Sequence, residues 1–313
     1  MLGARRASTN KLYDGYLNLW HKFCIDNNIN FLCATVVDGL TFLQQLKDDI
    51  SVKRQYSALA TARSAVSSVL NVNHNNCFIK FGEHPFVKQW MKGVEKEMPP
   101  KCRYLDIWDP DVVLNMFKNE NWSPIDILSD SMLAKKLMML LLLCTDNRGQ
   151  LIVSLSLNNM VRKEDMIIFK LESSDLKQGR RGYVPELIKI KPFVDKDLCP
   201  VSHLNEYLSR TQHIRKKEDK VFLISRKPYN PVSRDTVSRW TSEVLRSAGI
   251  DIDIFSAGST RAAAGSKANR KGVAMDTILK RGGWSQSSTF GRFYNKEVRS
   301  EDHDGFSDAV LSL

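Results

Sequence analysis

Cysteine and histidine are scarce in this sequence, and neither is arranged as a set of metal ligands. None of the six cysteines forms a CxxC pair, and none stands beside clustered histidines. Those spacings exclude the common zinc motifs and a disulfide framework, and they favour a reducing compartment. The cysteines are Cys24, Cys33, Cys77, Cys102, Cys144 and Cys199. We therefore expect neither a metal nor another cofactor.

The chain also lacks a long apolar run. The longest, LMMLLLLC from Leu137 to Cys144, is far shorter than the roughly 20 residues that span a bilayer. We interpret it as a buried helix. The start, MLGARRASTN, is basic but has no apolar segment behind it, so it does not have the pattern of a secretory signal. The sequence predicts a soluble intracellular protein without a membrane partner.

Basic residues exceed acidic ones, which gives a formal charge of +11 and a pI near 9.3. Residues 1–100 hold twelve lysines and arginines against eight aspartates and glutamates, so both halves of the chain are basic. Such a distribution suits a protein that grips a polyanion from two sides. Charge alone fits a basic scaffold with no nucleic-acid role equally well.

The first hundred residues have helical periodicity and no strand pattern. Apolar residues recur at helical spacing in STNKLYDGYLNLWHKFCIDNN, in VVDGLTFLQQLKDD, in SVKRQYSALATARSAVSSVLN and again after His84. Pro99, Pro100 and Pro110 punctuate the segment MPPKCRYLDIWDP, which we interpret as a linker. We expect a helical domain of about four helices at residues 1–100 and a second domain at residues 101–313.

The second domain has strand signals among its helical ones. MIIFKL at 166–171 and ELIKIKPF at 186–193 have strand character, and turn residues fill the segment between them. They predict a small antiparallel hairpin. Helical patterns come before and after it, and the tail EDHDGFSDAVLSL has helical spacing, which suits a helix that closes its own domain or packs on a neighbouring copy of the chain. The predicted fold class is mainly α with a small antiparallel sheet: a helical N-terminal domain and an α+β second domain.

The segment FSAGSTRAAAGSKANRKGVAMDTILKRGGWSQSSTFGRFYNKEV, from Phe255 to Val298, is the most informative of the chain. Its Ser-Thr step predicts a helix start that puts Arg261 in the first turn. A Gly-Gly pair predicts the end of a second helix just before Trp284. Ser285 is expected to cap a third helix that carries Tyr294. Taken singly, each of these side chains is explained by packing, because aromatic stripes usually belong to a core.

Their order along the chain carries more information than any one of them. Arg148 ends an apolar helix in CTDNRGQ, and Lys177 lies in the turn of the hairpin. Arg261 follows, then Trp284 twenty-three residues later and Tyr294 ten residues after that. This order resembles the tyrosine recombinase (phage-integrase-like) family. STRAAAGSKA, GVAMDTILKRGGW and STFGRFYNKEV are most similar to recombinases of eukaryotic mobile elements, namely Crypton, DIRS-like and Ngaro-like elements.

The resemblance implies a site-specific DNA recombinase or integrase that works through a covalent 3′-phosphotyrosine, without a metal. Arg148 and Arg261 would clamp the phosphate oxygens, since guanidinium groups bind them in a bidentate way. Tyr294 would be the nucleophile, Lys177 the general acid and Trp284 a supporting side chain. Lys170, Arg180 and Arg181 are alternatives to Lys177 as the acid. A eukaryotic element would act in the nucleus.

One position departs from the family pattern. The family has a histidine three residues before the second arginine, where this chain has Gly258. Three readings stay open: the chain works without that histidine, His203 or His303 replaces it, or the protein keeps DNA binding and has lost efficient cleavage. We favour retained activity, because the other five positions are present. The alternative is a catalytically weakened or silent DNA-binding protein derived from such a recombinase.

The predicted partner is double-stranded DNA, and the resemblance implies a homotetramer on it. The first domain would clamp the duplex. Lys53, Arg54 and Arg63 are its candidate DNA-binding residues, on the helix predicted around SVKRQYSALATARSAV. For any one of them taken alone, a solvated helix face is the more ordinary explanation.

Overall fold

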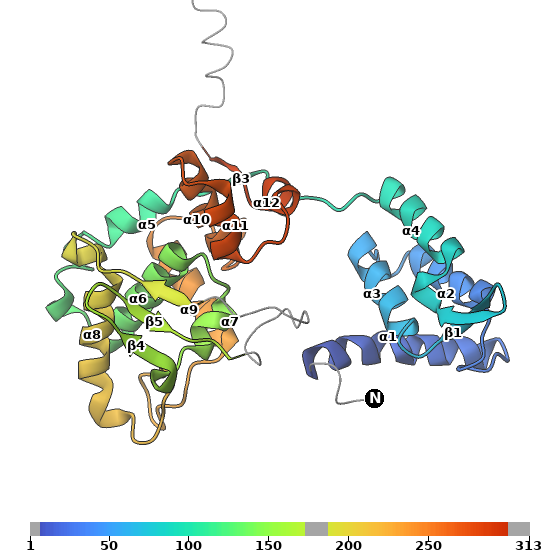
Figure 1. Cartoon of the computed structure of the whole chain (residues 1–313), viewed down its shortest axis with the longest axis horizontal. Helices are drawn as coiled ribbons and strands as arrows, with labels where there is room; N and C mark the ends of the chain where they lie inside the picture. The colour runs from blue at the N-terminus through green and yellow to red at the C-terminus, as the bar shows by residue number, and fades with distance from the viewer. Residues whose placement is uncertain (1–6, 173–186, 300–313) are drawn as a thin grey trace, which may run out of the picture. The chain divides into compact units, whose positions relative to one another are not determined.

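The computed structural model describes residues 7–172 and 187–299. The chain divides into two compact units, Met1–Lys101 and Cys102–Leu313. In Figure 1 the described residues are coloured from blue at the start of the first unit to red in the last helices of the second. Each unit is built around its own apolar core.

Four α-helices form most of the first unit: α1 (Ala7–Asp26), α2 (Val36–Asp48), α3 (Tyr56–Val66) and α4 (Pro85–Glu97). The start of α2 is fixed by a capping box in which Thr35 and Asp38 satisfy each other's backbone N–H groups. His84 caps α4, with Pro85 as its first residue. The helices pack around fully buried Trp20, Leu43 and Leu59, so the predicted helical periodicity is found where it was expected.

The prediction that the first unit has no strands is wrong. β1 (Asn71–His74) and β2 (Cys77–Lys80) pair as an antiparallel hairpin, with Val72 opposite Ile79. The turn residues Asn75 and Asn76 both have positive φ, 51° and 61°. Asparagine tolerates that region, and two such residues in succession make the tight turn that matches the twist of a hairpin. The Asn-Asn pair was the sequence signal for it.

The second unit is centred on α6 (Asp130–Thr145), whose apolar residues are buried on nearly every side. Around it lie α5 (Pro110–Met116), α7 (Gly149–Ser154), α8 (Pro200–Thr211) and α9 (Arg234–Ser247). The ammonium group of buried Lys136 donates hydrogen bonds to the carbonyls of Phe117 and Trp122, 2.8 and 2.6 Å away. These bonds join α6 to the segment that follows α5.

A three-stranded antiparallel sheet lies against this helical core. β5 (Ile167–Phe169) is in the middle, between β4 (Met160–Arg162) and β6 (Ile188–Ile190). β5 and β6 are the hairpin predicted from the sequence, and β4 is an additional strand. The fold class, mainly α with small sheets, is confirmed.

The C-terminal part of the second unit contains three helices, drawn in red in Figure 1: α10 (Ser259–Arg270), α11 (Met275–Gly282) and α12 (Ser287–Phe293). After them, β7 (Glu297–Val298) pairs in parallel with β3 (Asp106–Ile107) at the start of the unit. The Arg299 backbone N–H donates to the Ile107 carbonyl at 2.7 Å, and its side chain pairs with Asp106 at 2.8 Å. This pairing fixes the chain just beyond Tyr294. The predicted tail helix lies outside the described residues.

Two helical glycines of the first unit give a matched stability test. A Cβ at Gly39 of α2 would overlap the Phe81 ring, whereas a Cβ at Gly15 of α1 would meet no atom within 4 Å. Gly39→Ala should lower the free energy of unfolding by about 1–3 kcal/mol, because the core must shift to accept it. Gly15→Ala should raise that free energy by about 0.5–1 kcal/mol, since alanine is the better helix former. Urea denaturation of both variants measures the two signs, and a loss of stability in both would contradict this packing.

Candidate active site

Arg261 is the buried centre of the candidate site. It is the third residue of α10, as predicted from the Ser-Thr step, and only 6% of it is exposed. The small residues Ala262 and Ala263 beside it let α10 pack against Met139 and Leu140 of α6. Close helix packing therefore holds the arginine inside the unit, where an ordinary surface arginine would not lie.

Three groups from the last forty residues of the described chain surround the Arg261 guanidinium. It donates a hydrogen bond to the Gly282 carbonyl, and its central carbon lies 4.1 Å from the Trp284 ring centroid. The Tyr294 ring centroid is 5.3 Å from the same carbon. The Nε atom is buried and has no hydrogen-bond partner among the described residues. The guanidinium thus keeps a donor that an incoming acceptor could take.

The turn after α11 places Trp284 beside this arginine. Gly283 has φ 61°, a left-handed conformation that glycine adopts without strain, and it caps the helix. A Cβ on Gly282 would overlap the Trp284 ring, so this position also needs a glycine. The Trp284 ring is 9% exposed, and its indole N–H is buried without a partner in the described part of the chain.

Tyr294 lies directly after α12 and not on it, which corrects the prediction. Its backbone N–H donates to the Phe290 carbonyl, and its carbonyl accepts a 2.7 Å hydrogen bond from Ser266. Its half-buried ring is 4.8 Å from the Trp284 ring. Ser285 does not cap α12 either, since Gln286 is the N-cap residue and makes no side-chain cap.

Arg148 also differs from its predicted place. The apolar helix α6 ends at Thr145, because Asp146 is in the left-handed conformation with φ 54°. Arg148 is then the extended N-cap residue of the short helix α7. The loop between the two helices, not the end of α6, presents this arginine.

Electrostatics join Arg148, Arg261 and Tyr294 in one cluster. Burial lowers the pKa of Arg261 to about 10, and repulsion from Arg148 adds to this effect. Asp146 and Tyr294 act on the same pKa in the opposite direction. Arg261 therefore stays protonated at neutral pH, near a second guanidinium and the predicted nucleophile.

Asp146 is a member of this cluster that sequence reasoning missed. Burial raises the pKa of its carboxyl to about 7, against the opposing effects of Arg261, Arg148 and Arg281. Its Oδ1 atom is buried without a hydrogen-bond partner in the described ranges. The only sequence signal was a carboxylate two residues before Arg148, since its burial in the folded unit does not show in a local sequence pattern.

The position of the missing histidine is exposed and open. Gly258 precedes α10 with an ordinary φ of −69°, and a Cβ there would meet only the Ser256 hydroxyl oxygen, at 3.8 Å. Glycine is therefore not required by backbone or space.

His203 does not fill that role in the structure. It is fully buried in α8, and one ring nitrogen lies 2.8 Å from the Cys199 carbonyl oxygen. Burial lowers its pKa, and the charged groups that act on it are Lys136 and Asp197, not those of the arginine cluster. His303 and Lys177 lie outside the described residues.

The three basic candidates of the first unit differ in their surroundings. Lys53 is exposed and Arg54 pairs with Asp49 at 2.8 Å, and both precede α3 instead of lying on it. Arg63 lies on α3 and lines an open cavity of about 290 Å³ together with Lys80. Of the three, Arg54 is the one already held by a carboxylate.

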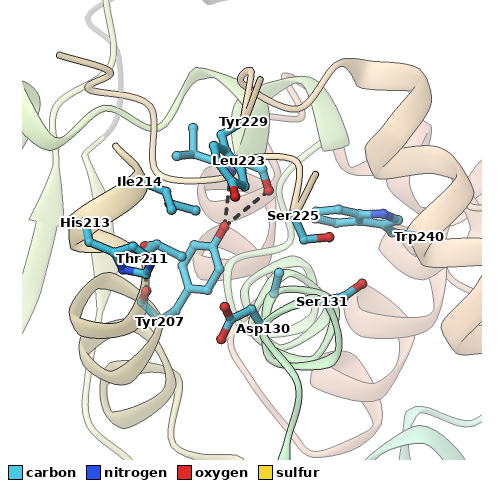
Figure 2. Close-up of a pocket in the computed structure, with 11 residues that line it drawn as sticks. Asp130, Ser131, Tyr207, Thr211, His213, Ile214, Leu223, Ser225, Tyr229 and Trp240 are labelled. Carbon is cyan, nitrogen blue, oxygen red and sulfur yellow. Dashed lines mark hydrogen bonds between the residues drawn. The ribbon is translucent and has the colours of Figure 1, made fainter. Parts of the chain in front are cut away.

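A separate cavity of about 100 Å³ lies between α6, α8 and α9, and Figure 2 shows its lining residues. The Tyr207 hydroxyl there accepts a 3.1 Å hydrogen bond from the Leu223 N–H and lies 3.4 Å from the Leu223 carbonyl. None of the arginine cluster lines this cavity. The Tyr207 hydroxyl is used within the packed unit, and this cavity is not part of the candidate site.

The described parts of the chain contain neither a metal-site pattern nor a membrane-spanning one. No group of three His, Cys, Asp or Glu side chains is arranged there to hold a metal ion. No helix within residues 7–172 and 187–299 has the length and apolarity to cross a membrane.

The raised pKa of Asp146 predicts how stability depends on pH. Its folded-state pKa of about 7 exceeds the ordinary 3.8, so ionisation destabilises the fold increasingly as pH rises toward 7. Asp146→Asn should therefore raise the free energy of unfolding by up to about 4 kcal/mol at pH 8, but by no more than about 2 kcal/mol at pH 5. Asparagine also tolerates the left-handed backbone.

Urea denaturation of wild type and variant at both pH values measures this difference. The control is Asp165→Asn, a change at an exposed aspartate between β4 and β5. If Asp146→Asn shifted stability equally at pH 5 and pH 8, the carboxyl would not be the buried, titrating group described above.

Comparisons with known proteins show which family the sequence of this chain matches. The model of the phage integrase family matches residues 111–300, a range that contains all of the predicted catalytic positions. A comparison with curated proteins finds no match.

Several solved structures share the fold at low sequence identity. A XerH site-specific recombinase bound to its difH substrate is 11% identical, with a TM-score of 0.52 over 89% of this chain and 71% of that one. A lambda integrase tetramer bound to a Holliday junction is 14% identical, with a TM-score of 0.51 over 96% and 76%. The Tn1549 transposon integrase in complex with transposon right-end DNA is 10% identical, with a TM-score of 0.51 over 90% and 86%.

At these identities the solved structures establish the fold alone, a helical N-terminal part followed by an α+β part. The family match covers more than half of the sequence and rests on the segment that holds the arginine cluster. The chain belongs to the phage integrase family of tyrosine recombinases.

Proposed function

We propose that this protein is a site-specific DNA recombinase of a mobile element, which cleaves and rejoins strands through a 3′-phosphotyrosine. The observation that carries the proposal is the buried Arg261 guanidinium, which lies beside the Tyr294 ring and within electrostatic reach of Arg148. Two permanent positive charges next to a phenol are what a phosphodiester needs, because it gains negative charge as it is attacked.

In the proposed reaction, the Tyr294 hydroxyl gives its proton to water, its oxygen bonds to phosphorus, and the bond from phosphorus to the 5′-oxygen breaks. The DNA 3′ end becomes attached to the tyrosine, and the leaving 5′-oxygen takes a proton, from Lys177 by family resemblance. Arg148 and Arg261 stabilise the non-bridging oxygens. The Trp284 ring packs over the Arg261 guanidinium, with its centroid 4.1 Å from the central carbon, and so limits the directions in which its donors can turn. No step requires a metal.

Double-stranded DNA is the proposed partner, gripped by the basic first domain at residues 1–100 and by the catalytic domain at 101–313. Lys53 and Arg63 are the better placed of the three basic candidates, since Arg54 is paired with Asp49. A homotetramer on DNA is proposed because a lambda integrase of the same fold forms a tetramer on a Holliday junction.

The mobile element and the nucleus belong to the proposal as well. The Tn1549 integrase, which shares the fold, is a transposon integrase. The sequence motifs STRAAAGSKA and GVAMDTILKRGGW support a eukaryotic element of the Crypton, DIRS-like or Ngaro-like type, whose DNA lies in the nucleus.

Gly258 favours a second candidate function, a DNA-binding protein with weak or no cleavage. Without a histidine at that position, the family's proton acceptor beside the phosphate is missing. This candidate keeps the fold and the DNA affinity, and it differs from the first only in whether a covalent complex forms.

Covalent trapping distinguishes the two functions. A duplex nicked beside the cleaved phosphate loses its short fragment after attack, so the phosphotyrosine accumulates. With a pooled set of such duplexes, wild type should give a slower-migrating protein–DNA band on a denaturing gel. Tyr294→Phe should abolish that band, because the attacking oxygen is gone, and should retain DNA binding.

The matched control is Tyr229→Phe, which removes another half-buried phenol of the same unit. It should trap DNA as wild type does. Absence of a covalent band with wild type would reject the recombinase and leave the DNA-binding candidate, and a band that persisted in Tyr294→Phe would assign the nucleophile elsewhere.

Restoring the histidine tests the role of Gly258. Its backbone and surroundings accept a side chain, so Gly258→His should fold. If proton transfer limits the present enzyme, the variant should trap DNA faster by about tenfold or more, within the range of general acid–base catalysis. Gly258→Gln, of similar size but without a titrating group, is the control and should not accelerate trapping. Equal rates for all three proteins would mean that this proton acceptor is not needed here.

A further inference from the structure

Among the residues that the structure describes, the Asp146 carboxyl is the one buried acid in the arginine cluster, and the proposed reaction gives it no part. Only 8% of the residue is exposed, and its Oδ1 atom has no hydrogen-bond partner among the described residues. The left-handed backbone at Asp146 ends α6 and turns the chain toward Arg148. A buried, unpartnered carboxylate oxygen is costly, so its surroundings should explain its presence.

Positive groups from three other helices of the unit act electrostatically on this carboxyl. Arg261 comes from α10, Arg148 from the start of α7 and Arg281 from α11. On its own helix the neighbouring titratable group is the Cys144 thiol, which is exposed. Tyr294 belongs to the same network through Arg261. Asp146 is thus the acid that offsets the mutual repulsion of the two predicted phosphate-binding arginines.

A DNA phosphodiester would bring a second negative charge to the same arginines. The phosphodiester stays ionised at any pH near neutrality, whereas the carboxyl titrates close to pH 7. Two anions competing for one pair of guanidinium groups repel each other, and the weaker acid relieves the repulsion by binding a proton. The arginines are then free to turn their donors, among them the unpartnered Arg261 Nε, toward the phosphate.

We propose that Asp146 is the internal counter-anion of Arg148 and Arg261, and that it takes up a proton when a DNA phosphodiester binds to them. This inference rests on the proposed function, since it assumes that the cluster receives a DNA phosphate. Asp146 is a positioning residue: it acts through the arginines and forms no bond to DNA.

The proposal has a definite pH dependence. If the carboxyl is protonated in the complex and ionised in the free protein, the affinity for DNA falls tenfold for each pH unit above the free-protein pKa. With that pKa near 7, affinity should fall about thirtyfold between pH 6 and pH 8.5. Below pH 7 it should level off, because the free carboxyl is then already protonated.

Fluorescence anisotropy with a labelled 30-base-pair duplex of arbitrary sequence tests this. Arbitrary sequence suffices, because the contacts concerned are to the backbone. Titrations from pH 6 to 8.5 at constant ionic strength should give the thirtyfold loss for wild type. Asp146→Asn should bind at every pH about as tightly as wild type does at pH 6, because its neutral amide mimics the protonated acid. Asp165→Asn, changed at an exposed site, should reproduce the wild-type profile.

Asp146→Gly is a second variant that keeps the left-handed backbone and removes the side chain, and it should also lose the pH dependence. The inference is overturned if Asp146→Asn or Asp146→Gly retains the wild-type slope, or if both fold by circular dichroism and bind more weakly than wild type at pH 8.5. Failure of wild type to bind the duplex at any pH rejects the proposed function and the inference together. Binding that does not vary with pH rejects the inference alone.

Discussion

A buried guanidinium held against two aromatic rings is the interaction on which the catalytic unit depends. Removing a positive charge from water is costly, and Arg261 recovers only part of that cost from the Gly282 carbonyl and the faces of Trp284 and Tyr294. One of its nitrogens is left without a partner in the described chain. A buried guanidinium with an unused donor is more typical of an anion-binding site than of a protein core.

Several features far apart in the sequence serve that arginine. The small residues beside it allow α10 to approach α6, and the Gly-Gly turn brings Trp284 back onto α11. The pairing of β7 with β3 fixes the chain beyond Tyr294, so the phenol is supported on both sides. The same segment of sequence therefore determines the local turns and the geometry of the charge cluster.

Much of the fold could be predicted from helical periodicity, because most helices of this protein have one clear apolar face. The hairpin of the first unit was missed, since its signal was a pair of asparagines with positive φ and not a long strand pattern. Arg261 was placed correctly because its Ser-Thr start is a local signal. Arg148 and Tyr294 were misplaced by a few residues, since helix ends depend on single backbone angles.

Asp146 could not have been predicted as a site residue. Its importance comes from its burial and from three guanidinium groups that act on it, two of which lie more than a hundred residues away. Sequence order indicated which residues carry charge or a nucleophile, but the balance between these charges appears only when the helices are packed.

The central claim is that Arg148, Arg261 and Tyr294 hold one phosphorus between them. A crystal structure of the protein with orthovanadate and two DNA strands ending at the cleavage point tests it directly, because vanadate adopts the five-coordinate geometry of the transferred phosphate. We predict vanadium bonded to the Tyr294 phenolic oxygen, with both guanidinium groups on its equatorial oxygens. Vanadate bound elsewhere, or bound here with Arg261 still turned only to Gly282 and Trp284, would contradict the account.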